Sequence, residues 1–200
     1  GNMNGIYLNS NGTNSTITFK DFSVKRNTIS NSDYIGIKLD GHSSFAPFPF
    51  FLNGEIDSNT VINCGSDAIN MKANNLNTQI VFDSIAINYN FLHNNGRSGI
   101  YMDLGACFAS HINFSENSIY NNGALGIDLV QDSLIYGSPY VPAPIIDSVV
   151  TTSGIITVHG KLNSIWPNRD FKIELFSNTL PDITGLGEGE TFFISDTINS

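Results

Sequence analysis

The sequence is poor in charged residues, and most of its charge is of one sign. Only 14% of the 200 residues are charged, with nine Lys and Arg against 18 Asp and Glu. Proteins that bind nucleic-acid phosphates or an anionic membrane surface need a basic patch, which this composition does not supply. We therefore expect no nucleic-acid partner.

Long apolar runs and helical patterns are also missing. No run of 18 apolar residues occurs, so the sequence contains no candidate membrane-spanning helix. No window of 12 or more residues spaces its apolar positions as a helix does. The first residues lack the pattern of a signal peptide. We expect no membrane insertion, and we expect any export signal to lie outside this sequence.

Cysteine is scarce. Cys64 and Cys107 are the only two, too few for a disulfide framework. They lie in different repeats of the pattern described below. Two interpretations remain open, a single disulfide bridge or two small buried thiols.

Asparagine and glycine are abundant instead, at 26 and 18 residues. Asparagine disfavours helix interiors and tolerates the left-handed backbone region, and glycine serves the same corners. Together with many Ile, Phe and Thr, this composition predicts an all-β chain with many turns.

One skeleton occurs four times. It consists of an Asn, an aliphatic residue two positions later, a second Asn after two more, and a small residue followed by Ile-x-Leu or Ile-x-Met. The copies are NTISNSDYIGIKL (27–39), NTVINCGSDAINM (59–71), NFLHNNGRSGIYM (90–102) and NSIYNNGALGIDL (117–129). The segment 5–8, GIYL, is the end of an earlier copy. The first Asn positions are 32, 31 and 27 residues apart, and the variation follows the Ile-x-Leu element. A constant core with variable inserts at one corner is typical of a solenoid.

The apolar residues alternate with a period of two, which predicts short strands that stack in parallel about 4.8 Å apart. Equivalent residues then form inward columns, of which Ile37, Ile69, Ile100 and Ile127 are one, with Leu129 also in the core. Both Asn columns are predicted to form hydrogen-bonded ladders at corners. Their members are Asn27, Asn59, Asn90 and Asn117, and Asn31, Asn63, Asn94 and Asn121.

This motif, N-x-[IVL]-x-N followed by [GA]-I-x-[LM], resembles the repeat of right-handed parallel β-helices in the pectate-lyase-like superfamily. The resemblance covers roughly residues 4–130 and implies a right-handed parallel β-helix of about five coils at 1–130. That superfamily includes polysaccharide lyases, glycoside hydrolases, epimerases, tailspikes and adhesins, so the resemblance does not choose a function.

The pattern stops at Leu129. Residues 131–144 contain three prolines and predict a linker, and residues 145–200 alternate as strands do. The stretch FKIELFSNTLPDITGLGEGETFF (171–193) resembles an immunoglobulin-like module that follows β-helix repeats in large exported bacterial surface proteins. The matched positions are Ile173, Phe176, Asn178, Thr179, Asp182, Gly185, Gly187, Glu188, Gly189, Thr191 and Phe192. The resemblance implies a partial, small antiparallel β-sandwich-like module and an extracellular or cell-surface location.

Candidate catalytic residues follow the Ile-x-Leu element, where Asp40, Lys72 and Asp103 fall in one outward column. Clustered carboxylates beside a base are what polysaccharide lyases and hydrolases require. The competing interpretation is a solvated ladder of cross-strand ion pairs.

Candidate binding residues are aromatic. Tyr101 lies in an outward column where a ring and amides suit a sugar. The insert 44–54 holds Phe45, Phe48, Phe50 and Phe51, which either form an exposed apolar patch for a partner or fold back onto the solenoid.

Asp182, Glu188 and Glu190 are hard oxygen ligands in a glycine-rich loop, where a calcium site is one interpretation and solvated carboxylates are the other. The scattered histidines show no metal-ligand spacing. We therefore expect no cofactor.

The sequence favours a non-catalytic segment of a large exported bacterial surface or secreted protein, acting as a stalk, adhesin or carbohydrate-binding scaffold. The alternative is a polysaccharide-processing lyase, hydrolase or epimerase, and a viral spike segment is a third interpretation. The expected partners are a polysaccharide or cell-surface ligand, and the rest of a longer chain that caps the open ends of the coil stack.

Overall fold

A computed structural model describes residues 4–10, 17–41, 50–73, 80–105, 107–130, 144–163, 168–181 and 188–199. The described residues form only strands, turns and irregular segments, and they contain no helix that could cross a membrane. The chain divides into two compact units. One comprises Gly1–Ser138 with Phe176–Phe193, and the other comprises Pro139–Leu175 with Ile194–Ser200.

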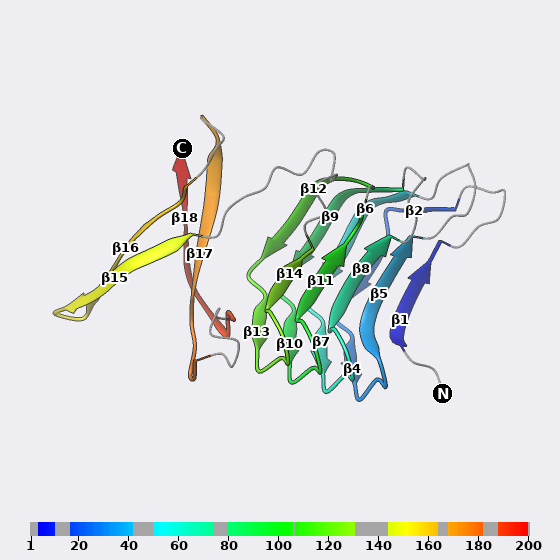
Figure 1. Ribbon diagram of the computed structural model, residues 1–200, viewed down its shortest axis with the longest axis horizontal. Helices are drawn as coiled ribbons and strands as arrows, with labels where there is room; N and C mark the ends of the chain where they lie inside the picture. The colour runs from blue at the N-terminus through cyan, green and yellow to red at the C-terminus, as the bar shows by residue number, and fades with distance from the viewer. Residues whose placement is uncertain are drawn as a thin grey trace. The chain divides into compact units, whose positions relative to one another are not determined.

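Three parallel sheets build the first unit (Figure 1). Sheet A contains β1 (Asn4–Asn9), β5 (Ile35–Gly41), β8 (Ile69–Ala73), β11 (Ile100–Asp103) and β14 (Ile127–Leu129). Sheet B contains β2 (Thr18–Lys20), β3 (Ser23–Lys25), β6 (Phe50–Asp57), β9 (Val81–Asn88) and β12 (Phe108–Ser115). Sheet C contains β4 (Thr28–Ser30), β7 (Thr60–Ile62), β10 (Phe91–His93) and β13 (Ser118–Tyr120). The chain passes through sheets A, B and C in turn four times and then enters sheet A again. The all-β prediction and the parallel β-solenoid are confirmed.

The strand register confirms the predicted columns. In sheet A, Ile37 pairs with Ile69, Ile69 with Ile100, and Ile100 with Ile127. The aliphatic residues between the two Asn positions form the column of sheet C: Ile29, Val61, Leu92 and Ile119. The repeat in the sequence is therefore the coil of the solenoid.

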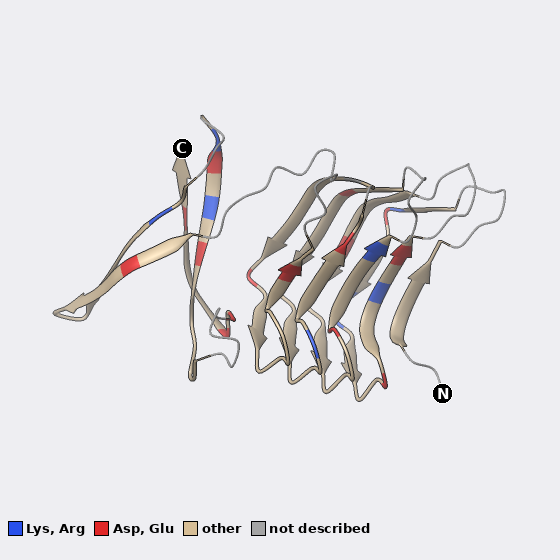
Figure 2. Ribbon diagram, in the orientation of Figure 1, with Lys and Arg blue, Asp and Glu red and all other residues tan. Residues whose placement is uncertain are grey.

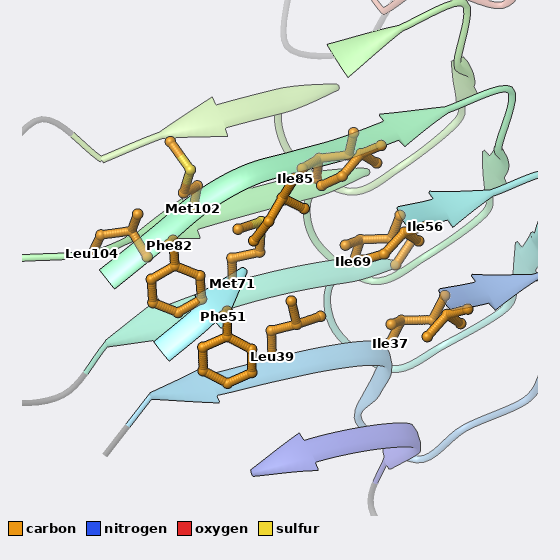
Figure 3. Packing of buried hydrophobic residues seen from close by; sticks show 14 of the residues in the cluster. Ile37, Leu39, Phe51, Ile56, Ile69, Met71, Phe82, Ile85, Met102 and Leu104 are labelled. Atoms are coloured by element: carbon orange, nitrogen blue, oxygen red, sulfur yellow. The ribbon is translucent and has the colours of Figure 1, made fainter. Parts of the chain in front are cut away.

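The core lies inside the coils, where Figure 3 shows side chains of sheets A and B packed against one another. Val61, Leu92 and Ile119 add side chains from sheet C to this core. Three rings from sheet B stack in it, with centroid distances of 5.1 Å for Phe19 and Phe51 and 4.7 Å for Phe51 and Phe82. Each fully buried side chain of this kind stabilises the fold by about 1.5–3 kcal/mol. The expectation that Ile127 and Leu129 are core residues is wrong, because they lie on the last strand of sheet A and remain 42% and 45% exposed.

The first Asn column forms a ladder. The backbone N–H and the Nδ2 of Asn59 both donate to Oδ1 of Asn90, at 3.0 Å each. Asn90 donates in the same way to Asn117, at 3.0 and 2.9 Å. Asn27 donates to Asn59 at 3.0 Å. The predicted ladder is confirmed.

The second ladder lies one residue later than predicted. Asn95 donates from its backbone N–H and its Nδ2 to Oδ1 of Asn122, at 3.1 and 2.9 Å, and the Cys64 N–H donates to Oδ1 of Asn95 at 3.0 Å. The predicted members instead lie exposed at φ near +55°: Asn31, Asn63, Asn94 and Asn121. Their role is to turn the chain, because Asn tolerates this backbone conformation.

Two further columns of positive φ complete the coil. One lies in sheet B, at Asp21, Asn53, Ser84 and His111. The other lies between sheets B and C, at Arg26, Ser58, Tyr89 and Glu116. Each coil therefore bends three times at single left-handed residues.

The remaining strands form two small antiparallel sheets. The hairpin of β15 (Ile145–Thr152) and β16 (Ile155–Lys161) turns at Ser153 and Gly154. β17 (Asp170–Ser177) pairs with β18 (Thr191–Asn199). The immunoglobulin-like module and the division at 130 and 144 stay predictions, and the compact units group residues 176–193 with the solenoid instead.

Candidate functional site

The outer face of sheet A carries two polar rows, which we call row 1 and row 2. Row 1 consists of Tyr7, Lys38, Asn70, Tyr101 and Asp128. Row 2 consists of Asn9, Asp40, Lys72 and Asp103. Successive members lie on neighbouring strands, about 4.8 Å apart. Figure 2 shows the alternation of acidic, basic and acidic residues at the ends of β5, β8 and β11.

Asp40 is the most enclosed carboxylate of the face. Its Oδ2 accepts a hydrogen bond from the Tyr7 hydroxyl at 2.7 Å and lies 2.7 Å from Nζ of Lys38. That Nζ also lies 5.1 Å from the centroid of the Tyr7 ring. The other oxygen, Oδ1, is buried and has no hydrogen-bond partner among the described residues.

Asn70 occupies the centre of row 1 and is only 5% exposed. Its Nδ2 donates to Oδ2 of Asp67 at 2.7 Å, and Oδ1 of Asp67 accepts the Ser98 N–H at 3.1 Å. The Oδ1 of Asn70 is a second buried acceptor to which no described group donates.

Tyr101 lies between two charges. Its hydroxyl donates to Oδ2 of Asp103 at 3.4 Å, and the Arg97 guanidinium lies 5.6 Å from the ring centroid. Lys72 Nζ lies 3.9 Å from the same Asp103 oxygen. The sequence interpretation missed Arg97 and Asp67, because both lie in the turn before a strand, outside the Ile-x-Leu element.

Burial and neighbouring carboxylates keep both tyrosines protonated. Burial, and after it Asp40, raises the pKa of Tyr7 to about 12. Burial, and after it Asp103, raises the pKa of Tyr101. Both hydroxyls therefore remain hydrogen-bond donors at neutral pH.

Row 2 brings together the three catalytic candidates. The backbone positions of Asp40 and Asp103 are two strand spacings apart, about 10 Å. Lys72 stands between them, and Lys38 pairs with Asp40. Each carboxylate thus has a cation beside it, as an ion-pair ladder does.

Of the four phenylalanines in the aromatic insert, the structure describes Phe50 and Phe51. Phe51 is fully buried between the rings of Phe19 and Phe82, so it cannot contact a ligand. Phe50 is partly buried. Phe45 and Phe48 lie outside the described residues.

The calcium candidates are bound to other groups where they are described. Glu188 accepts hydrogen bonds from Asn122, and Glu190 accepts them from Thr179. Asp182 lies outside the described residues. Within the described ranges, no three His, Cys, Asp or Glu residues come close enough to hold a metal ion.

Both cysteines are free and buried, which leaves the interpretation as two small thiols. Burial raises the pKa of Cys64 and of Cys107, so neither is a reactive thiolate at neutral pH.

A recess of about 840 Å³ lies at the corner after sheet C, inside the first compact unit. Its lining includes Tyr120, the corner residues Asn63, Asn94 and Asn121, and Glu188.

Comparison of the chain with models of protein families, with curated proteins and with solved structures finds no match in any of the three.

Proposed function

We propose that this chain is a non-catalytic carbohydrate-binding scaffold, a segment of a larger exported surface protein, and that it binds polysaccharide on the outer face of sheet A. The observation that carries the proposal is the outward row of aromatic and polar side chains on neighbouring parallel strands, in which Tyr7 is 45% exposed and Tyr101 is partly exposed. A tyrosine ring beside polar groups offers an apolar face and hydrogen-bonding partners to a sugar.

The arrangement of row 1 suits a chain of sugars. Tyr7 and Tyr101 lie three strands apart, about 14 Å, with Lys38 and Asn70 between them. Aromatic rings offer an apolar surface beside a polar hydroxyl. A surface that repeats along the solenoid can contact successive units of a polymer with equivalent groups.

The charges of the face favour a neutral polysaccharide. Lys38, Lys72 and Arg97 stand against Asp40, Asp103 and Asp128, and the buried Asp67 beneath Asn70 adds a fourth carboxylate, so the face has no positive excess. A polyanion would need a net positive surface. The same pairing argues against catalysis, because a general acid or base requires a carboxylate free to exchange a proton with substrate.

The test is binding to a panel of immobilised neutral and acidic polysaccharides. Tyr101→Ala removes one ring and is expected to weaken binding up to about tenfold, given 0.5–1.5 kcal/mol for a well-placed ring contact. The matched control is Tyr89→Asn, which removes an exposed tyrosine at φ +55° outside sheet A and keeps a residue that tolerates this conformation. Equal weakening by both variants, or no binding by the unmodified protein, would sink the proposal.

The same panel tests the enzymatic alternative. Each polysaccharide is incubated with the protein, and reducing ends and the absorbance of unsaturated products are followed. Turnover that Asp103→Asn abolishes would replace the scaffold with a polysaccharide-processing enzyme.

A further inference from the structure

The last strand of sheet C is covered by residues from far along the chain. The Ile119 N–H donates to the Gly189 carbonyl at 2.7 Å, and the Ser118 hydroxyl donates to the Glu190 carbonyl. These residues belong to the same compact unit as the solenoid. The segment Glu188–Gly189–Glu190, which we call the terminal segment, therefore occupies the place of one more strand beside β13.

Glu188 also completes the second Asn ladder. The backbone N–H and the Nδ2 of Asn122 donate to its two carboxylate oxygens, at 3.2 and 2.9 Å. These are the same two donors through which Asn95 binds Asn122. Glu188 is only 7% exposed, so its carboxylate is part of the interior.

Local contacts fix the terminal segment in place. Glu190 N–H donates to Oδ1 of Asn178 at 2.7 Å, and the Glu190 carboxylate accepts from the backbone N–H and the hydroxyl of Thr179. A side chain on Gly189 would begin 2.7 Å from the ring of Phe176. The segment is thus built to approach β13 closely.

The neighbouring end of sheet A has no such cover among the described residues. Ile127 and Leu129 are 42% and 45% exposed, whereas Ile69 and Met71, two strands earlier in the same columns, are fully buried. Another chain can pair with a strand edge whose backbone N–H and carbonyl groups are unpaired. An exposed apolar surface beside that edge favours such association further, because association removes it from water.

We propose that the terminal segment is a stop that prevents a second copy of this chain from pairing edge to edge with β13 and burying Ile127 and Leu129. A second copy fits this end because its own end presents the same edge and the same two aliphatic side chains. Two such ends can meet about a twofold axis. With the stop in place, the Ile119 N–H and both Asn122 donors already have acceptors, so the edge of sheet C is closed. Among the described strands, the edges of β14 and β12 remain at this end of the solenoid.

The first experiment tests whether the terminal segment covers the ladder, by hydrogen exchange. Glu188→Ala is expected to speed exchange of the Asn122 amide roughly tenfold or more, since hydrogen bonds to charged groups contribute about 1.5–3 kcal/mol. The Asn95 amide, which donates to Asn122 itself, should keep its protection. Glu188→Gln retains an acceptor and should restore slow exchange. An unchanged Asn122 amide would overturn the proposal.

The second experiment measures mass by light scattering over a wide range of protein concentration. Glu188→Ala is expected to associate at concentrations where the unmodified protein, Glu188→Gln and the surface control Glu55→Ala do not. Adding Leu129→Ser to Glu188→Ala should reverse the association. A Glu188→Ala protein with the mass of the unmodified protein, or association that Leu129→Ser leaves intact, would overturn the proposal.

A second variant covers the case in which Glu188→Ala does not fold. Gly189→Val displaces the terminal segment through the Phe176 ring and leaves the ladder residues unchanged. It is expected to give the same association and the same fast exchange at Asn122, while the interior Ile100 amide shows that the coils remain folded. Gly189→Val with the exchange and mass of the unmodified protein would count against the stop.

Discussion

Asn90→Ala is the most direct test of the first ladder. Asn90 is fully buried, and its side chain serves groups on two neighbouring coils. Its Oδ1 accepts from the Asn59 backbone N–H at 3.0 Å, and its Nδ2 donates to the Ile56 carbonyl at 2.8 Å. Alanine has no side-chain polar group, so the Asn59 N–H loses its acceptor and the Ile56 carbonyl loses this donor.

The expected cost follows from these two groups. A buried backbone group that loses its partner costs about 1–3 kcal/mol, so two such groups lower the free energy of unfolding by about 4 kcal/mol. The Nδ2 of Asn59 loses one of its two acceptors and keeps the Val24 carbonyl, and Oδ1 of Asn117 keeps the Asn90 backbone N–H, so the two unpartnered groups dominate the loss. For a unit of this size the melting temperature should fall by roughly 8–16 °C.

The measurement is urea unfolding followed by circular dichroism, with the slope of the transition checked for constancy. Asn113→Ala is the matched control, because Asn113 is exposed and makes one hydrogen bond, at 3.1 Å, to the side chain of Asn88. The control should change stability by no more than about 0.5 kcal/mol. A loss for Asn90→Ala below about 1 kcal/mol would refute the reasoning, since water or a shifted backbone would then have replaced the amide.

Three further predictions concern single positions. Burial lowers the pKa of His93, so the native state binds fewer protons than the unfolded chain, and the free energy of unfolding should fall as pH drops below about 6.5. Urea unfolding on both sides of that pH measures this, and His93→Gln should flatten the dependence; an unchanged slope would contradict it. Gly96→Ala should lower the free energy of unfolding by about 1–3 kcal/mol, because the new Cβ would overlap the Gly65 carbonyl oxygen of the preceding coil. A melting temperature equal to that of the unmodified protein would show that the two coils can separate at this point. The Tyr7 hydroxyl should ionise near pH 12 in an ultraviolet titration, and Asp40→Asn should lower that value towards the ordinary one for tyrosine; no shift would mean that burial alone holds the proton.

The columns of the core could be predicted from the sequence because they depend on local alternation. Ile37, Ile69 and Ile100 recur at a fixed offset from an Asn, and a fixed offset within each coil becomes a fixed register between coils. The exposure of Ile127 could not be predicted in this way. It depends on what lies beyond the last strand, and periodicity carries no information about an end.

The corners were predicted less well, because backbone conformation restricts residue type only weakly. Asn31, Asn63, Asn94 and Asn121 share both a residue type and a positive φ, so the pattern located this corner and assigned it the wrong role. The other two corners show no common residue type. The corner between sheets B and C, for example, holds residues as different as Arg26 and Tyr89 at the same φ of +55°. No single amino acid marks those positions, and the sequence pattern could not find them.

Part of the candidate site could be predicted because it depends on the strand register. Residues at equivalent positions of successive coils pair with one another, so the predicted outward columns correctly made neighbours of Asp40, Lys72 and Asp103, and placed Tyr101 beside Asn70. Glu188 belongs to no repeat. Its contact with Asn122 joins residues 66 positions apart, and only the folded chain shows that a carboxylate there continues a ladder of amides.

The two ladders give the solenoid a polarity. In each ladder the hydrogen bonds between side chains run one way, because each Nδ2 donates to the Oδ1 of the Asn in the coil that follows, from Asn27 to Asn59 and onward. The backbone N–H of each ladder residue donates in the same direction, and the second N–H of Nδ2 returns to a backbone carbonyl of the preceding coil. Aligned amide dipoles add, as they do along a helix, and hydrogen bonds in series polarise one another. The last coil is therefore the positive pole of each column, where the N–H groups point outward. A carboxylate is the side chain that such a pole attracts, so the negative charge of Glu188 stabilises the end of its ladder in the way an acidic residue stabilises the first turn of a helix.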